Sequence, residues 1–294
     1  MADVLAHYHM FDYKARCAVA LTTELVRDAK RRHDLDPLTT IAVGRALSCA
    51  ALLASTLKQG KEYVHCSFAG EGVLSRVIGE CNGDGHCRGY AVPARIMDVL
   101  EPGGKVPESV GEATGHGRGM LTVTRGRAGE HSPYTAVLSL ANGEIATDIA
   151  RYLTESEQIP SAVAAGVKLS VDGDVVAAGG VLVQKLGGAE LDDAVLTGLE
   201  QHMASIHLSD RIASGASVDD LVDYVAGGDK HYGLLTTRPL LFQCSCSRDR
   251  MASALASLGE EQLRQIRRET GKIEVRCQYC SEARQFRIEE LLTH

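Results

Sequence analysis

Apolar and polar positions change their spacing several times along the chain, and each change predicts a different kind of element. Residues 21–30 and 38–58 show helical patterns; the second is rich in alanine and leucine, and Gly60 follows where a helix end is expected. Between residues 61 and 92, β-branched residues are mixed with glycine clusters. This mixture predicts short strands joined by tight turns.

The strand pattern returns twice further along the chain. Residues 120–140 predict a hairpin, and residues 144–160 predict a helix that stops at its final proline. Two further strands are expected on either side of a turn at Asp172-Gly173. Clustered helices followed by hairpins predict an α+β core domain at residues 1–185.

A different pattern begins after the core domain. Five apolar residues recur at helical spacing and predict one apolar stripe: Leu191, Val195, Leu199, Met203 and Ile206. Ser217 and Asp220 resemble a capping box that begins a second helix. Such short helices are marginal in water, so residues 186–240 are predicted to form an amphipathic helical linker that lies on a surface. A plain linker packed permanently on the core is the simpler alternative.

Composition narrows the class of protein. Of the 294 residues, 45% are hydrophobic and 23% are charged, which is typical of a soluble globular chain with room for two domains. The net charge of −7 disfavours a general nucleic-acid binder. The N-terminus lacks a signal peptide's apolar region, and the most apolar stretch, residues 41–57, is short and contains Arg45. We therefore expect a cytoplasmic protein that does not bind membranes.

Four of the nine cysteines are concentrated near the C-terminus in two close pairs. Cys244 and Cys246 form a C-x-C pair, Cys277 and Cys280 form a C-x-x-C pair, and thirty residues separate the pairs. In a reducing compartment, paired thiols more often serve metal or redox chemistry than structural disulfides. Four thiolates can form a closed, tetrahedral zinc site, which is structural because no ligand position remains open.

The module that carries these cysteines, residues 241–294, is small enough to depend on a metal. Its spacer predicts two helices whose inner face consists of Met251, Leu255, Leu258, Leu263 and Ile266. Oxidation would remove thiolate ligands, since each close pair can form a disulfide within itself, Cys244 with Cys246 and Cys277 with Cys280. Nearby arginines either stabilise the negative centre or form an ordinary solvated surface: Arg248, Arg250, Arg276 and Arg284.

The remaining cysteines lie outside this pattern: Cys17, Cys49, Cys66, Cys81 and Cys87. Cys81 and Cys87, with His86 between them, suggest a second metal site. No second pair accompanies them, however, and the glycines at 83 and 85 indicate a turn. Buried or turn thiols are therefore the favoured interpretation.

The two C-terminal cysteine pairs resemble those of the heat-shock protein 33 family of redox-regulated chaperones, and the resemblance extends over essentially the whole chain. The most specific element is C-S-C at 244–246, followed after the spacer by C-Q-Y-C at 277–280. The segments LLASTLKQG, SEQIP and AAGGVLVQ in the first domain also resemble family segments.

The resemblance implies an ATP-independent holdase rather than an enzyme, which binds unfolding client proteins under oxidative stress. In the family, peroxide or hypochlorite, especially with heat, expels zinc from four cysteines; disulfides form, the zinc module and linker unfold, and the protein dimerises. For this chain, the resemblance implies that the four C-terminal cysteines hold one zinc ion when reduced and act as the redox switch. The stripe from Leu191 to Ile206 becomes the candidate latch, which hides an apolar client surface.

Two alternatives stay open at this point. A zinc-ribbon nucleic-acid binder suits the cysteine pairs but not the acidic charge balance. A thiol oxidoreductase using Cys277 and Cys280 suits an order of strand, motif and helix in residues 272–286. Only fourteen residues follow Cys280, too few to complete a thioredoxin-like unit.

Overall fold

The chain is described from a computed structural model, which describes residues 2–58, 60–188, 197–199, 201–203, 207–228, 231–269, 272–287 and 290–291. Its contacts divide the chain into two compact units: unit 1, residues 1–242, and unit 2, residues 243–294. The predicted division of unit 1 into a core domain and a linker stays a prediction.

Unit 1 combines helices with strands, as the α+β prediction requires. Its strands are β1 (Val4–Met10), β2 (Ala15–Leu21), β3 (Glu62–Gly70), β4 (Arg76–Asn82), β5 (His86–Val92), β6 (Gly119–Arg127), β7 (Tyr134–Ser139), β8 (Ser161–Leu169), β9 (Val175–Lys185), β10 (Tyr232–Pro239) and β11 (Leu241–Phe242). Its helices are α1 (Thr23–His33), α2 (Pro37–Ala54), the short η1 (Ile96–Asp98), α3 (Val110–Thr114), α4 (Ala146–Glu155), α6 (Leu208–Ala213) and α7 (Val218–Val225).

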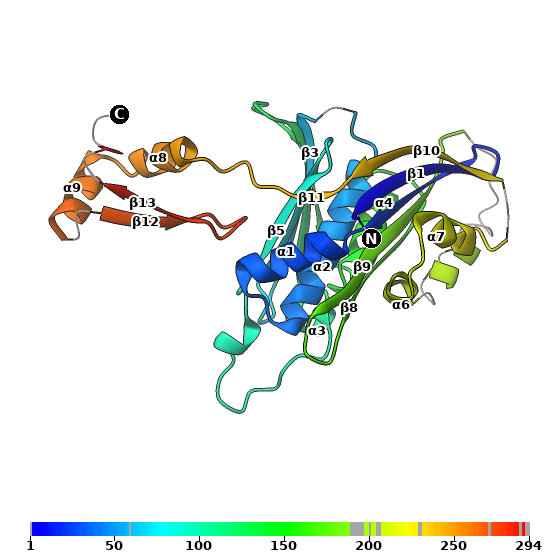
Figure 1. The fold of residues 1–294 in the computed structure, drawn as a ribbon, viewed down its shortest axis with the longest axis horizontal. Coiled ribbons are helices and arrows are strands. Elements are labelled where there is room, and N and C mark those ends of the chain that lie inside the picture. Colours follow the sequence, from blue (N-terminus) through cyan, green and yellow to red (C-terminus); the bar gives the residue numbers. More distant parts are fainter. Residues whose placement is uncertain are drawn as a thin grey trace. The chain divides into compact units, whose positions relative to one another are not determined.

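The strands of unit 1 form two sheets with α2 packed against both of them (Figure 1). The five-stranded sheet has the order β10-β1-β2-β9-β8 and is antiparallel throughout. The six-stranded sheet has the order β11-β5-β4-β3-β6-β7, and only its β11–β5 pair is parallel. The main core consequently lies around α2, between the inner faces of the two sheets.

Helix α2 contains most of the apolar stretch at 41–57, which was not predicted to span a membrane. It is long and apolar enough to cross a membrane, but 78% of that window is buried inside the protein. Asp36 caps its first turn by accepting the N–H of Thr39 at 2.9 Å. Gly79 of β4 allows the helix to pack closely, because a Cβ there would lie 2.3 Å from the carbonyl oxygen of Ala46. Helix α2 is thus a core helix of unit 1.

The outer face of the five-stranded sheet is also buried. In β9 every residue from Ala177 to Gln184 is buried, so the strand has no solvent-facing side over that length. Helices α6 and α7 and the helical residues 197–199 and 201–203 contribute to this second core. The predicted amphipathic character of α7, with its Ser217–Asp220 capping box, is confirmed.

Several elements differ from the sequence predictions. The predicted helix at 38–58 ends at Ala54, where the N–H of Ser55 bonds to Leu52 and tightens the last turn. Strands β1 and β2 were not predicted. Residues 232–239 of the predicted helical linker form β10, which pairs along β1. In this part of the linker, long-range strand pairing replaces the expected helix.

Asp3, directly before β1, is a buried carboxylate that caps a helix far away in the sequence. Its oxygens accept the N–H groups of Glu24 at 3.1 Å and Leu25 at 2.6 Å, in the first turn of α1. The residue before α1, Thr22, provides no side-chain cap of its own. Burial nevertheless dominates and raises the pKa of Asp3 to about 6.

This raised pKa predicts a pH dependence of the stability of unit 1. Because folded Asp3 binds its proton more tightly than the unfolded chain does, its contribution to stability falls as pH rises from about 4 through about 6. We expect the unfolding free energy of wild type, relative to that of Asp3→Asn, to fall by about 1 kcal/mol between pH 5 and pH 7. Urea unfolding of both proteins at several pH values measures this change. The prediction is contradicted if the unfolding free energy of wild type relative to the variant stays constant or rises.

The described part of unit 2 includes two helices, α8 (Arg248–Ala256) and α9 (Glu260–Glu269), and a hairpin of β12 (Lys272–Arg276) and β13 (Ala283–Arg287); residues 290–291 are also helical. The predicted pair of helices in the spacer is therefore confirmed. The core of unit 2 is small, and its buried members are Met251, Leu255, Leu263, Phe286 and Leu291. Leu258, predicted on the inner face, is exposed instead because it lies in the turn between α8 and α9.

Candidate metal centre

The two cysteine pairs sit at the ends of ordered elements in unit 2. Cys244 and Cys246 lie just before α8, whose first turn is capped by Ser247 through the N–H of Arg250. Cys277 and Cys280 lie in the turn that joins β12 to β13. The N–H of Ser281 bonds to the Cys277 carbonyl at 2.8 Å, and this contact closes the turn so that both sulfurs face the same side.

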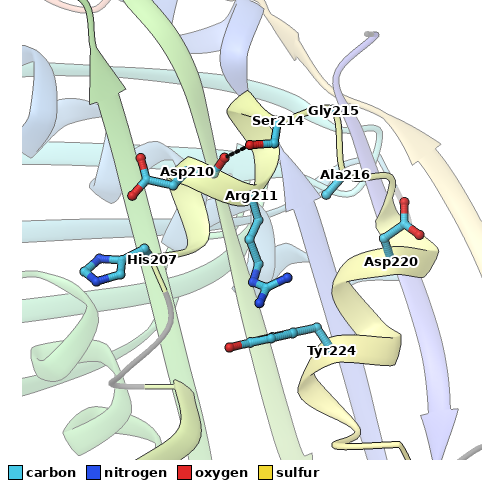
Figure 2. Close-up of a pocket in the computed structure, with 8 residues that line it drawn as sticks. All are labelled: His207, Asp210, Arg211, Ser214, Gly215, Ala216, Asp220 and Tyr224. Carbon is cyan, nitrogen blue, oxygen red and sulfur yellow. Dashed lines mark hydrogen bonds between the residues drawn. The ribbon is translucent and has the colours of Figure 1, made fainter.

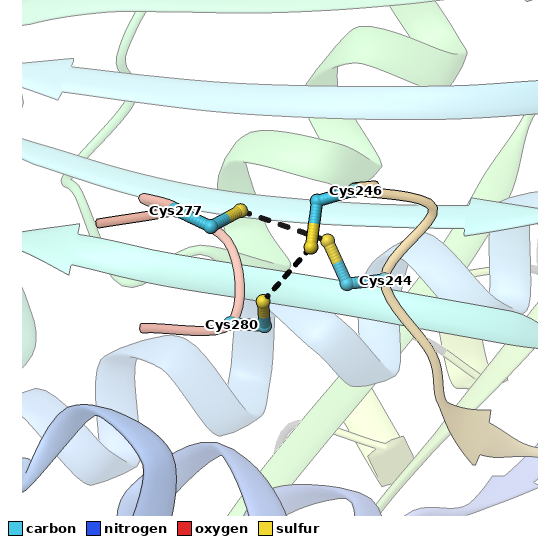
Figure 3. A group of neighbouring side chains, drawn as sticks. All are labelled: Cys244, Cys246, Cys277 and Cys280. Carbon is cyan, nitrogen blue, oxygen red and sulfur yellow. Dashed lines mark hydrogen bonds between the residues drawn. The ribbon is translucent and has the colours of Figure 1, made fainter. Parts of the chain in front are cut away.

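The four sulfurs form one compact cluster, with two contributed by each segment (Figure 3). All four lie within 4.8 Å of one another. Cys244 Sγ is 3.8 Å from Cys277 Sγ, and Cys246 Sγ is 3.4 Å from Cys280 Sγ. In a tetrahedral site with Zn–S bonds of about 2.3 Å, the sulfurs are about 3.8 Å apart. The spacing therefore fits a four-thiolate zinc site.

Burial matters for the charge state of these thiols. Cys280 is buried, whereas the other three are partly exposed. Desolvation is the main cause that raises the pKa of Cys280 to about 11, and it also raises the pKa of Cys246. Four adjacent thiolates would also repel one another, so ionisation of the cluster needs a bound cation to balance the charge.

The four predicted arginines divide into two groups. Arg250 Nη1 donates to the Ser245 carbonyl at 2.9 Å, inside the C-x-C loop, and Arg276 Nη1 donates to the Ser281 carbonyl at 3.1 Å, beside the second pair. These two hold the backbone of the cysteine loops. Arg248 instead pairs with Glu290 and Arg284 with Glu282.

Two of the five predicted latch residues lie in the described part of the chain. Leu199 and Met203 are 7% and 2% exposed, and both belong to the second core over the five-stranded sheet. Met203 also lies beside Ala162 of β8. Leu191, Val195 and Ile206 fall outside the described residues. The structure thus places two latch positions on an apolar sheet face.

Polar contacts that the sequence patterns missed also hold the linker to the sheet. The hydroxyl of Tyr8, in β1, donates to Asp219 of α7 at 2.6 Å. Lys168, at the end of β8, pairs with Asp210 of α6 at 2.6 Å. The partners are far apart in sequence, so no local motif could have revealed them.

A pocket of about 550 Å³ lies between α6 and α7 (Figure 2). The Arg211 guanidinium stacks over the ring of Tyr224, 3.2 Å from its centre. The hydroxyl of Ser214 donates to the Asp210 carbonyl of its own helix. The eight lining residues that the structure describes all belong to 207–224, so α6, α7 and the turn between them form this pocket.

The five other cysteines are all buried, which for Cys81 and Cys87 agrees with the favoured interpretation as buried or turn thiols. Within the described part of the chain, the only cluster of three or more potential metal ligands from histidine, cysteine and acidic residues is the C-terminal one. The alternative of a metal site at Cys81 and Cys87 therefore gains no third ligand from the described residues.

Comparisons with known proteins show which family the chain is similar to. The family model described as "Hsp33 protein" matches residues 3–287. The "33 kDa chaperonin" of Symbiobacterium thermophilum is 39% identical over 99% of this chain and 97% of its own length; that of Desulfotalea psychrophila is 37% identical over 99% and 96%. The crystal structure of the 33 kDa chaperonin (heat shock protein 33 homolog) from Thermotoga maritima matches with a TM-score of 0.85 and 31% identity, covering 100% of this chain and 98% of that one.

Proposed function

The chain belongs to the Hsp33 family, and from this premise we propose that it is a redox-regulated, ATP-independent holdase of the cytoplasm that binds unfolding proteins under oxidative stress. The observation that carries the proposal is the cluster of four sulfurs within 4.8 Å, set in a unit with a small core. Membership in a chaperone family supports a role in binding client proteins, and the four clustered thiols supply groups that an oxidant can attack.

In the reduced state, Cys244, Cys246, Cys277 and Cys280 hold one zinc ion as thiolates. When bound, zinc supplies a structural cross-link and the positive charge that keeps the sulfurs ionised. Arg250 and Arg276 hold the two cysteine loops in place through their carbonyl contacts. The metal therefore stabilises unit 2 rather than taking part in substrate chemistry.

Oxidation acts on this state by removing thiolate ligands. We propose disulfides between Cys244 and Cys246 and between Cys277 and Cys280. These loops are so short that they constrain the chain little, and they cannot replace the stabilisation lost with the metal. Unit 2 then unfolds, and the linker loosens with it.

The linker acts as the latch. Leu199 and Met203 cover an apolar face of the five-stranded sheet that includes Met10, Val19 and Val183. Exposure of such a face creates a large apolar patch, which is the kind of surface that binds unfolding proteins or a second copy of the chain. Client binding and dimerisation are thus proposed to follow from release of the linker.

The proposal is tested by an aggregation assay with a heat-unfolding client. Reduced, zinc-loaded protein is expected to leave light scattering unchanged, and protein oxidised with peroxide at raised temperature is expected to suppress it without ATP. Reversal by dithiothreitol is the control. Equal suppression by the reduced and oxidised forms would exclude redox regulation.

Disulfide mapping provides a separate prediction about the pairing. Hydrogen bonds join Cys244 to Cys277 and Cys246 to Cys280 across the loops, and Cys246 and Cys280 also interact with the other cysteine of their own loop, so the two pairings compete. Trypsin separates the loops, since Arg248 and Arg276 lie between the pairs and Arg284 follows the second. After oxidation we expect each peptide to contain an internal disulfide. A species linking the two peptides would instead establish pairing across the loops.

The structure also bears on the thiol-oxidoreductase alternative. That alternative requires a helix after Cys280, but residues 283–287 form β13 of a hairpin. The order of strand, motif and helix proposed for it is therefore wrong. Holding of clients in fixed proportion, rather than repeated turnover of a disulfide substrate, is the behaviour we expect.

A further inference from the structure

A second pair of thiols lies together in the core of unit 1. Cys81 of β4 and Cys87 of β5 are direct partners in the antiparallel register, and their Sγ atoms are 2.7 Å apart. Partners in antiparallel strands have Cα atoms about 4.5–5.5 Å apart, within the range of about 4.4–6.8 Å that a disulfide spans. A bond between these sulfurs therefore needs no change in strand register.

The other buried thiols of unit 1 lack this arrangement. Cys17 lies on β2, in the five-stranded sheet, while Cys49 and Cys66 lie on α2 and β3. Within the described residues of unit 1, Cys81 and Cys87 are the one pair of sulfurs joined by a hydrogen bond; Cys66 interacts electrostatically with Cys81 and Cys49 without such a bond. Cys17, Cys49 and Cys66 consequently provide internal comparisons for any oxidation experiment.

We propose that Cys81 and Cys87 form a second redox site, separate from the metal centre, which a hydroperoxide oxidises to an intrachain disulfide. The Cys81 sulfur attacks the peroxide and takes one oxygen to become a sulfenic acid; its thiol proton leaves with the other oxygen, so an alcohol is released, or water from hydrogen peroxide. The sulfur of Cys87 then attacks the Cys81 sulfur, the S–O bond breaks, and water leaves with the thiol proton. The two sulfurs lose two electrons, and the peroxide gains them.

Hydrogen bonding indicates which sulfur reacts first. The Cys87 thiol donates to Cys81 Sγ, so it can stabilise negative charge on Cys81. Burial raises the pKa of Cys87, which keeps that thiol protonated as the donor. Cys81 is accordingly the nucleophile toward peroxide, and Cys87 is the resolving thiol.

Access to the pair is controlled by the segment just before the metal centre. Both cysteines are 0% exposed, so peroxide cannot reach them in the closed fold. Strand β11 pairs with His86 and Cys87, and the N–H of Leu241 bonds to the Gly85 carbonyl at 3.0 Å. Pro239 also lies against this turn, where a Cβ on Gly85 would come within 2.1 Å of the Pro239 carbonyl oxygen.

The position of β11 predicts that Cys81 and Cys87 are oxidised after the metal centre. Strand β11 has two residues, is an edge strand, and ends two positions before Cys244. Assuming the proposed function, unfolding of unit 2 and the linker removes the restraints on either side of β11 and exposes the turn. Oxidation of Cys81 and Cys87 then follows zinc release, and the disulfide holds the β4–β5 hairpin closed while β11 is detached.

Mass spectrometry of the full-length protein tests the pairing. Peroxide-treated protein is alkylated in denaturant and cleaved with trypsin; residues 77–88 then carry both cysteines, and further cleavage before Asp84 separates them. We expect two fragments joined by a disulfide, while Cys17, Cys49 and Cys66 stay alkylated. Recovery of both cysteines as alkylated thiols, or oxidation of Cys81 without linkage to Cys87, overturns the inference.

Zinc released in the same samples separates this inference from the proposed function. Zinc release with Cys81 and Cys87 still reduced contradicts the second redox site and leaves the switch standing. Linkage of Cys81 to Cys87 with zinc fully retained supports the second site, but it contradicts both the switch and the order in which zinc release precedes oxidation of the pair.

Control of access by β11 is tested with two variants at one exposed position. Leu241 is 54% exposed, so its side chain is not required for the core. Leu241→Pro removes the N–H that bonds to Gly85, whereas Leu241→Ala keeps it. We expect the proline variant to form the Cys81–Cys87 disulfide while zinc is still bound, and wild type and the alanine variant to form it only after zinc is released. Equal rates in all three proteins contradict control of access by β11.

Discussion

Removal of zinc from the reduced chain is expected to unfold unit 2 and to leave unit 1 folded. Among its described residues, the core of unit 2 has five buried apolar members, which is marginal for a unit of 52 residues. Zinc binding contributes about 10–16 kcal/mol in small metal-dependent peptides, far more than such a core. Hydrogen exchange should therefore show full loss of protection in α8, β12 and β13 when a chelator is added with a thiol reductant.

A ligand variant and a control in the same unit sharpen this result. Cys280→Ser removes the most buried of the four sulfurs and should cause the same loss of protection without a chelator. Ser253→Ala changes an exposed position of α8 and should leave protection unchanged. Protection of β12 and β13 that persists in metal-free, reduced protein would mean that the hydrophobic core alone maintains unit 2.

Charged residues at the two described latch positions are expected to activate the protein without oxidant. In Leu199→Glu/Met203→Glu, two side chains that are almost fully buried are replaced by carboxylates. Burial of each apolar side chain contributes about 1.5–3 kcal/mol, and an unpaired buried charge adds a further penalty. The linker should detach from the sheet, and the reduced protein should suppress client aggregation.

The same segment offers a matched control. Thr197 and Gln201 are exposed neighbours of the latch positions, so Thr197→Glu/Gln201→Glu adds the same charge on the solvent side. This control should behave as wild type in the aggregation assay and in binding of an apolar dye. If the Leu199/Met203 variant also shows no basal activity, the linker is not the element that hides the client surface.

The elements that sequence patterns predicted are those with local signals. The hairpin at 120–140 and the turn at Asp172-Gly173 were found because alternation and turn residues occur together there, and both are present as β6–β7 and β8–β9. Strands β1 and β2 lack such a signal. The turn between them has Phe11, Asp12 and Tyr13 in left-handed conformations, without the glycine or proline that normally marks a turn.

Long-range pairing accounts for the other misses in the fold. Strand β10 pairs with β1 at positions such as Thr237 with Ala6, and five of its eight residues are exposed. It therefore has no apolar periodicity of its own. The contact between Tyr8 and Asp219 joins residues 211 positions apart, beyond the reach of any local pattern.

The clustering of the four C-terminal cysteines could be predicted because each pair is close in the sequence; their role as zinc ligands stays a prediction. C-x-C and C-x-x-C place two ligands each within one loop, and only one long-range contact between the loops is then needed. Cys81 and Cys87 show the opposite case. Five residues separate them, and only the register of β4 with β5 brings their sulfurs together.

The central claim is that loss of the metal from the four-cysteine cluster activates the chaperone. The most direct test is a peroxide titration at raised temperature in which released zinc and suppression of client aggregation are measured in the same samples. We predict that both rise together, with one zinc ion released per chain at full activity. Full activity in samples that retain all their zinc would contradict the account.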